Sequence, residues 1–326
     1  MNINVTHELA TRLLAAGTEP VSGQQLAEEF GVSRTAIWKH MKELEAMGYE
    51  IESVRKKGYR INNSPDSLEA FLVQAGLKTK KIGQRIEYLE QCASTQIVAH
   101  QLAQEGAPDG TAVISELQTE GRGRLMRKWD SAKGQGIWMS IILRPELPPH
   151  KSPQFTLVAA VAIVRAIQSV TGLDASIKWP NDILFGTKKA TGILTELQSD
   201  ADGIQALIIG IGVNVNQERK DFDAEVQDIA TSLRLESGQP VNRRKLVQEI
   251  LHCLEIYTDM YIEEGFAPLK ELWEGHSATI GKAVRARMSR ETLEGIAEGI
   301  TEDGVLQLRT ADGKVHGIYS ADIELK

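Results

Sequence analysis

The stretch SGQQLAEEFGVSRTAIWKHMKELEAMGYEIESVRKKGYRI, residues 22–61, contains two helix signals followed by a hairpin signal. Ser22 and Ser33 are suited to helix N-caps, because a serine hydroxyl can accept a hydrogen bond from an unpaired backbone amide of the first turn. Beyond Ser33, apolar residues recur with a period near 3.6 up to Leu44, and Gly48 stands where a helix commonly ends. The stretch therefore predicts two helices in close succession.

A further helix and a turn complete this N-terminal region. Thr6–Ala16 carries leucines on one side, which predicts an amphipathic helix. Residues 50–61 alternate around Lys57-Gly58, which predicts a hairpin with a two-residue turn. Asn62–Pro65 has the composition of a linker. Three helices and a hairpin in this order predict a winged helix-turn-helix.

The outward surfaces of this predicted unit are basic. Ala27, Gly31 and Ile37 have the spacing of a helix-turn-helix, with a small residue at the helix crossing, a glycine at the turn and an aliphatic residue beneath. We expect a DNA major groove to be contacted by Ser33, Arg34, Thr35, Lys39 and Lys42, and phosphates by Arg55, Lys56 and Lys57. The alternative is a three-helix interaction domain with a solvated basic hairpin.

Length and composition set the limits for the rest of the chain. A length of 326 residues predicts two domains, or three if some are small. Hydrophobic residues make up 42% and charged residues 25%, which is typical of globular proteins and excludes a disordered or fibrous chain. The net charge of −7 argues against a general nucleic-acid binder, so any nucleic-acid contact must depend on local basic clusters.

Cysteine content and apolar runs indicate the compartment. Cys92 and Cys253 are far apart in the sequence and lack CxxC spacing, which favours a reducing compartment over a disulfide framework or a zinc site. The longest apolar run, Leu157–Val164, is too short to cross a bilayer, and the N-terminus shows no secretory signal pattern. These features predict a soluble, cytoplasmic protein without a membrane partner.

Beyond the N-terminal unit, strand and helix signals are mixed. The predicted strands are Thr111–Leu117, Gly136–Leu143, Ala190–Gln198 and Gln205–Val215, the last two joined by the turn SDADG at residues 199–203. The predicted long helices are Ser94–Glu105, Ser152–Val170 and Arg243–Glu264. Because several strands are joined by short turns, an α+β fold with a mixed sheet is favoured over a doubly wound one.

The C-terminal part has a different pattern, in which short strands alternate with turns over residues 277–326. This pattern predicts a small β-barrel. The predicted domains are therefore residues 1–64, a winged helix-turn-helix; residues 65–275, a ligand-binding and catalytic domain; and residues 276–326, the barrel.

A glycine-rich basic loop, QTEGRGRLMRKW, lies at Gln118–Trp129 between two predicted strands. Its basic side chains are Arg122, Arg124, Arg127 and Lys128. They repel one another unless they are solvated or face an anion, and guanidinium groups match phosphate oxygens in pairs. The alternative is a mobile, solvated loop. The loop is neither a Walker A motif nor GxGxxG, because Met126 occupies the position of the third glycine.

Two further motifs could contribute to a pocket. In KWPNDILFGTKKATGIL, residues 178–194, Pro-Asn-Asp is good turn chemistry, but Trp179 and Asp182 beside two lysine positions also suit a nucleotide and its metal. Lys189 directly precedes an apolar strand, which would draw its ammonium group toward a partly buried site. In GIGVNVN, Asn214 and Asn216 share one strand face, where buried amides either order neighbouring loops or contact ligand.

In the order of its motifs, the chain resembles the bifunctional biotin–protein ligases that also repress biotin genes. These motifs are the winged helix, GRGRLMRKW, KWPNDI, KKATGIL and GIGVNVN. The resemblance covers essentially the whole chain and implies a central domain related to class II synthetases. It implies a biotin and nucleotide site made of Ser94, Thr95, Gln96, Gln118, Arg122, Gly123, Arg124, Trp129, Lys189 and Asn214. One departure from the family pattern is Met126, where the loop commonly has glycine.

The resemblance also implies the reaction. Biotin and Mg-ATP would give biotinyl-5′-AMP, and a lysine of a biotin carboxyl carrier domain, from acetyl-CoA carboxylase or pyruvate carboxylase, would then accept the biotin. Lys189, Arg122 and Arg124 are the expected catalytic residues, and Asp182 the expected ligand of Mg2+. Operator DNA and a ligand-promoted homodimer are the expected partners in repression. The alternatives are a non-catalytic biotin-sensing transcription factor and a lipoate–protein ligase.

Overall fold

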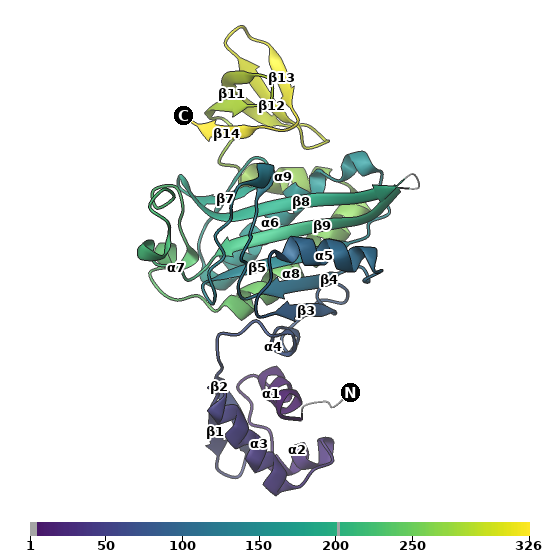
Figure 1. Cartoon of the computed structure of the whole chain (residues 1–326), viewed down its shortest axis with the longest axis vertical. Coiled ribbons are helices and arrows are strands. Elements are labelled where there is room, and N and C mark those ends of the chain that lie inside the picture. Colours follow the sequence, from purple (N-terminus) through teal and green to yellow (C-terminus); the bar gives the residue numbers. More distant parts are fainter. Residues whose placement is uncertain (1–4, 201–202) are drawn as a thin grey trace. The chain divides into compact units, whose positions relative to one another are not determined.

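The computed structural model describes residues 5–200 and 203–326, and the chain divides into two compact units (Figure 1). The first unit comprises Met1–Lys78 and Asn242–Gln248, and the second Thr79–Val241 and Glu249–Lys326. The first unit thus extends past the predicted boundary at residue 64. The C-terminal segment, predicted as a separate domain, shares one compact unit with the central region.

The first unit contains the predicted three helices and hairpin. The helices are α1 (Val5–Ala15), α2 (Gly23–Glu29) and α3 (Arg34–Ala46), and the strands are β1 (Glu50–Val54) and β2 (Gly58–Asn63). A short helix, α4 (Ala70–Gln74), follows them. The predicted caps are present: the Ser22 hydroxyl accepts from the Gln24 amide and the Ser33 hydroxyl from the Ala36 amide. Leu9, Leu26, Ile37 and Leu44 are buried in the core of this unit.

The hairpin turn differs from its prediction. Val54 pairs with Gly58, so the connection is Arg55–Lys57 rather than the two-residue turn Lys57-Gly58. Gly58 instead begins β2, where a Cβ atom would lie 1.9 Å from the backbone oxygen of Val21. The glycine is required because the hairpin passes directly against the segment before α2. Tyr59 of the hairpin and Val21 of that segment exchange two backbone hydrogen bonds.

The second unit is built on a seven-stranded mixed sheet in the order β3-β4-β5-β9-β8-β7-β6. Its strands are β3 (Ile86–Leu89), β4 (Thr111–Ser115), β5 (Gly136–Leu143), β6 (Ser176–Lys178), β7 (Asp182–Phe185), β8 (Lys188–Asp200) and β9 (Gly203–Asn214). β3 and β4 are parallel and the other neighbours antiparallel, so the predicted mixed α+β sheet is confirmed. Residues 201–202 of the predicted SDADG turn lie outside the described residues.

Helices cover both faces of this sheet (Figure 1). α5 (Thr95–Gln104) packs on one face through Ala99 and Ala103, and α6 (Gln154–Thr171) lies on the other face with α9 (Ala267–Gly275). Residues 149–171 are long and apolar enough to cross a membrane, but 67% of their apolar 18-residue window is buried inside the protein, as expected for a core helix. The remaining helices are α7 (Leu233–Ser237) and α8 (Arg243–Glu264).

The C-terminal segment forms a five-stranded antiparallel sheet in the order β13-β12-β11-β10-β14. Its strands are β10 (Ala283–Arg287), β11 (Thr292–Ile300), β12 (Leu306–Thr310), β13 (Val315–Ile318) and β14 (Asp322–Leu325). This antiparallel sheet agrees with the small all-β C-terminal region predicted from the sequence, and its two outer strands, both fully described, form no ladder with each other. Its short strands and turns are those expected from the sequence.

Candidate active site

A cavity of about 870 Å³ in the second unit brings the central motifs together. It is bounded by the start of α5, the basic loop after β4, strands β8 and β9, and residues 221–230. Every predicted biotin- or nucleotide-binding residue lines it: Ser94, Thr95, Gln96, Gln118, Arg122, Gly123, Arg124, Trp129, Lys189 and Asn214. Asp182 lines it as well. Segments far apart in the sequence, from Ser94 to Leu325, therefore form one pocket.

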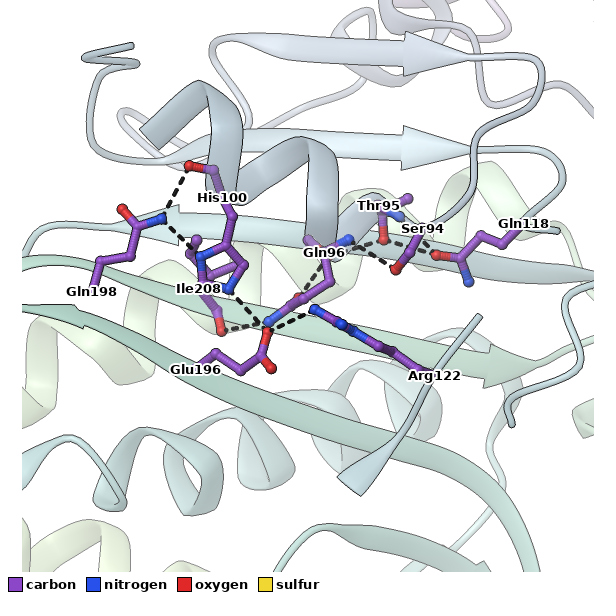
Figure 2. A network of polar contacts seen from close by, with 10 residues as sticks. Ser94, Thr95, Gln96, His100, Gln118, Arg122, Glu196, Gln198 and Ile208 are labelled. Carbon is purple, nitrogen blue, oxygen red and sulfur yellow. Dashed lines mark hydrogen bonds and ion pairs between the residues drawn. The ribbon is translucent and has the colours of Figure 1, made fainter. Parts of the chain in front are cut away.

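One side of the pocket is a corner of amide and hydroxyl groups (Figure 2). The Gln118 side-chain oxygen accepts from the Thr95 backbone amide at 2.8 Å and from the Thr95 hydroxyl at 3.1 Å. The Thr95 and Ser140 hydroxyls lie 2.9 Å apart, and Ser140 donates to the Gln96 side-chain oxygen at 2.9 Å. Thr95, Gln96 and Ser140 are buried and Gln118 is half-buried, and these groups fix one another, so they present a rigid set of donors and acceptors to a polar, uncharged ligand group.

The floor of the pocket is formed by glycines of two paired strands. Gly192 on β8 pairs with Gly212 on β9, and the Trp129 indole lies against both. A Cβ atom on Gly212 would be 2.6 Å from Trp129 Nε1, and one on Gly210 would be 2.6 Å from the Gln96 side-chain oxygen. Glycine inside a strand often marks such a close approach. The two glycines of GIG, residues 210 and 212, are therefore the feature of the sequence that corresponds to this floor.

A carboxylate between two ammonium groups lies beside the Trp129 ring. Lys189 Nζ is 2.7 Å from one Asp182 oxygen, and Lys178 Nζ is 3.2 Å from the other. Lys189 Nζ also stands 5.1 Å from the centre of the Trp129 ring. Asp182 therefore orients Lys189, and its expected role as a magnesium ligand does not fit because both oxygens already face cations. No cluster of three or more metal-ligating side chains occurs in residues 5–200 and 203–326.

Two arginines tie the basic loop to its surroundings, although residues 125–128 at its tip are exposed. Arg124 donates to the Asn181 side-chain oxygen at 3.1 Å and to the Ser320 hydroxyl at 2.9 Å, while Arg127 pairs with Asp322 at 2.6 Å. Burial lowers the pKa of the Arg124 guanidinium and outweighs the charges of Asp182 and Asp322, which raise it. A partly desolvated guanidinium at a pocket wall is well placed to bind an anion.

The loop folds back on itself through backbone hydrogen bonds. Trp129 donates its amide to Gly121 and Gly123 donates to Arg127, each at 2.8 Å. The tip is strained, because Leu125 and Met126 adopt left-handed φ values of 56° and 58°. Met126 thus takes a backbone conformation suited to the family's glycine, at a cost of about 1–2 kcal/mol for a non-glycine residue.

The remaining predicted residues, of which only Asn214 lines the pocket, have structural partners. Asn214 donates to the Thr231 backbone oxygen at 3.1 Å and accepts from Gln217 at 3.2 Å. The amide of Asn216 exchanges two hydrogen bonds with the backbone of Val241. Both asparagines therefore order neighbouring loops, one of the two roles expected from the sequence. Trp179 lies outside the pocket lining, where it is buried and donates to the Gly304 backbone oxygen.

Several pocket residues were not predicted. Those that line it are Ser140, Lys178, Asn181, the glycines of the floor and a stretch within residues 221–230. Behind the lining, Ser131 binds Gln118 and Glu196 pairs with Arg122. Ser140 is a single polar residue within an apolar strand, and only the pairing of that strand brings it to the pocket. Asn181 was interpreted as turn chemistry, and its contact with Arg124 depends on the position of the loop.

In the first unit, the predicted DNA-facing residues are exposed. Arg34, Thr35, Lys39 and Lys42 share the outer side of α3 with Trp38, whose side chain is 52% exposed. Ser33 caps α3, and Lys42 pairs with Glu45 at 2.6 Å.

The basic side chains of the hairpin differ in their surroundings. Arg60 is neutralised by Glu52 at 2.8 Å. Arg55, Lys56 and Lys57 are exposed and form no ion pair within the described part of the chain.

Three family models match successive parts of the chain. The one described as "HTH domain" matches residues 7–60, "Biotin/lipoate A/B protein ligase family" matches residues 88–214, and "Biotin protein ligase C terminal domain" matches residues 279–326. The matched segments correspond to the three-helix unit, the pocket-bearing sheet and the C-terminal sheet.

Individual relatives match over most or all of their length. The chain is 48% identical over 325 residues, 100% of both chains, to a Bacillus spizizenii protein named "Bifunctional ligase/repressor BirA". It is 32% identical over 231 residues, 69% of this chain and 95% of the other, to the Paracoccus denitrificans "Biotin--[acetyl-CoA-carboxylase] ligase". The solved structure "Biotin protein ligase from Aquifex aeolicus in complex with biotin and ATP" has a TM-score of 0.65 at 30% identity, covering 74% of this chain and 99% of that one.

Proposed function

This chain belongs to the bifunctional biotin ligase/repressor family, and from that premise we propose which of its residues carry out each step. The protein is a biotin–protein ligase with a helix-turn-helix domain for repression, and biotin and ATP are its substrates. The assignment of roles below depends on one observation, the convergence of cationic side chains beside a neutral polar corner in a single pocket.

The neutral corner suits the ureido ring of biotin. That ring offers two N–H donors and a carbonyl acceptor. Buried Ser94, Thr95 and Gln96 at the start of α5, with half-buried Gln118 beside them, supply groups of both kinds. We assign the ureido group to this corner, with the apolar part of biotin along the glycine floor. The carboxylate then lies toward the basic loop, where Arg122 and Arg124 stand.

Adenylation places negative charge at that end of the pocket. A carboxylate oxygen of biotin attacks the α-phosphorus of ATP, the bond to the β-phosphate oxygen breaks, and pyrophosphate leaves. Such a step depends on positioning and positive charge more than on covalent help from the protein. Arg122, Arg124 and Lys189 supply that charge. Asp182 holds Lys189, and Trp129 forms part of the nucleotide wall.

Magnesium enters this proposal only with ATP. The residues around Asp182 offer no cage for a resident ion, since its carboxylate is paired with two lysines. A magnesium ion bound to ATP takes most of its ligands from phosphates and water, so it needs few ligands from the protein.

The second step transfers biotin to a carrier. The neutral amine of a carrier lysine attacks the acyl carbon of biotinyl-5′-AMP, AMP leaves, and the amine loses a proton. The basic loop protects the mixed anhydride by covering it from water. We propose a biotin carboxyl carrier domain as the acceptor, that of acetyl-CoA carboxylase first and of pyruvate carboxylase second, in the cytoplasm.

Repression follows from the first unit. The outer side of α3 and the hairpin residues Arg55–Lys57 would bind operator DNA, α3 to base edges and the hairpin to phosphates. We propose that the adenylate favours a homodimer and that the dimer binds two half-sites, so that ligand and DNA binding are linked. Sedimentation with and without biotin and ATP tests this link, and an unchanged mass in both states would contradict it.

The decisive experiment mixes the purified protein with biotin, Mg-ATP and a biotin carboxyl carrier domain, and follows the mass of the carrier. We expect a gain of one biotin that depends on ATP. Biotin binding without any gain would favour a non-catalytic sensor. Lipoate in place of biotin serves as the specificity control, and modification with lipoate alone would favour the lipoate ligase.

A further inference from the structure

A chain of four polar side chains connects the outside of the sheet to the pocket (Figure 2). Gln198 and Glu196 lie on β8, His100 on α5 and Arg122 in the basic loop. Gln198 Nε2 is 2.7 Å from His100 Nδ1, His100 Nε2 is 2.9 Å from a Glu196 oxygen, and the same oxygen is 3.6 Å from an Arg122 terminal nitrogen. Of these four residues, Arg122 alone lines the pocket.

The hydrogen bonds select one tautomer of the neutral His100 ring. The Gln198 amide nitrogen also donates to the His100 backbone oxygen at 3.0 Å, so the atom facing the ring is a donor and not the amide oxygen. His100 Nδ1 must then accept, which places the proton of the neutral ring on Nε2. Nε2–H donates to Glu196, and the carboxylate keeps its charge for Arg122.

The surroundings of Glu196 keep it ionised. Burial raises the pKa of this carboxyl, but the hydrogen bonds from His100 and Gln96 and the charge of Arg122 outweigh burial, so the pKa of Glu196 lies below its ordinary value. Gln96 belongs to the amide corner of the pocket and also donates to the Ile208 backbone oxygen at 3.3 Å. Glu196 thus contacts both the corner assigned to biotin and the loop assigned to phosphate.

Arg122 has a donor left over. Its Nε is buried and has no hydrogen-bond partner within the described residues, although an unsatisfied buried N–H is costly. One terminal nitrogen of the guanidinium forms an ion pair with Glu196 at 3.6 Å, and the residue lines the pocket. The remaining donor is therefore available to an acceptor that arrives with the ligand.

We propose that Glu196 is a positioning residue that, held by His100 and Gln198, fixes the Arg122 guanidinium so that its free Nε–H meets the biotin carboxylate or the α-phosphate. The inference rests on the proposed function of the pocket. An arginine side chain has many rotamers, and a misplacement of about 1 Å at a reacting group can cost about a hundredfold in rate. Glu196 selects one orientation without touching substrate.

The test is a double-mutant cycle on adenylate formation, followed as pyrophosphate release with biotin and ATP. Glu196→Gln removes the charge but keeps the shape, and kcat/KM for biotin should fall about tenfold. In the Arg122→Ala background the same change should cost less than about twofold, because Glu196 acts through Arg122. The thermal unfolding temperature is measured for each variant.

Two further variants separate positioning from folding. His100→Gln keeps an amide donor near the position of Nε2 and should retain most of the activity, whereas His100→Leu should resemble Glu196→Gln. Glu298→Gln is the matched control, since it removes a similarly exposed carboxylate paired with Arg309 in the C-terminal sheet. That control should keep the activity of the unmodified protein.

The outcomes distinguish this inference from the proposed function. If the unmodified protein releases no pyrophosphate with biotin, the proposed function fails. If it does and Glu196→Gln is equally active, only the positioning role fails. An equal loss in both backgrounds, accompanied by an equal fall in unfolding temperature, would assign Glu196 a structural role and overturn the inference.

Discussion

Adding one methyl group to the pocket floor should test the assignment of the Trp129 wall. In Gly212→Ala the new Cβ would meet Trp129 Nε1 at 2.6 Å, Cε2 at 2.7 Å and Cζ2 at 3.1 Å. The other side of the floor cannot yield, because Gly212 lies between β5 and β8 and pairs with Trp138 and Gly192. The indole must therefore move away from the sheet.

The size of that movement follows from the contact distance. Ordinary carbon contacts begin near 3.5 Å, so the ring must move outward by about 0.9 Å. Overpacking of this kind costs about 1–3 kcal/mol, which lowers the unfolding temperature of a unit of this size by about 2–12 °C. A displacement of about 1 Å in the wall that positions the nucleotide should lower kcat/KM for ATP by about a hundredfold.

The assay is adenylate formation together with thermal unfolding, for Gly212→Ala in the unmodified protein and in Trp129→Ala. The control is Gly275→Ala at the end of α9, where no atom lies within 4 Å of the new Cβ and activity should be unchanged. Unaltered ATP kinetics in Gly212→Ala would refute the reasoning. So would a loss of stability that persists in full without the Trp129 ring.

Three other predictions follow from contacts in the two units. Arg124→Ala should release biotinyl-5′-AMP faster than the unmodified protein, because the buried guanidinium at the pocket wall is lost; equal retention of the adenylate contradicts its role. The Glu255 carboxylate accepts hydrogen bonds from three backbone amides at 2.7 Å. Burial raises the pKa of this carboxyl, but the three hydrogen bonds outweigh burial and lower the pKa below its ordinary value of 4.5. Ionised Glu255 therefore stabilises the fold at pH values above 4.5, and this stabilisation is lost as the pH falls through the folded-state pKa. The difference in unfolding temperature between the unmodified protein and Glu255→Gln should therefore shrink below about pH 4.5, and a constant difference down to pH 3 contradicts this. Replacing Arg55, Lys56 and Lys57 by alanine should weaken operator binding, lower its log–log salt slope by about 2–3 and leave biotin transfer unchanged; an unaltered slope would exclude phosphate contacts.

Local sequence determined the elements whose signals lie within a few residues of one another. Ser22 and Ser33 cap α2 and α3 as predicted, and α8 and β5 have their predicted bounds. Short elements such as β6 and α7 were missed, because three to five residues carry too little periodicity to stand out. The turn at Gly58 was misplaced because its glycine serves a contact with Val21, which is remote in sequence.

The sequence by itself determined which residue types gather around the ligand, since the basic loop, the lysine before β8 and the Ser-Thr-Gln start of α5 are continuous motifs. Only the tertiary structure decided what each of them touches. Strand pairing places Gly192 beside Gly212 under Trp129, and the packing of α5 on the sheet brings His100 to Glu196. Asp182 was expected to bind metal, but it lies between two lysines because β6 pairs with β7 and β7 with β8. Such contacts depend on register and packing between distant segments, which no local pattern of residues encodes.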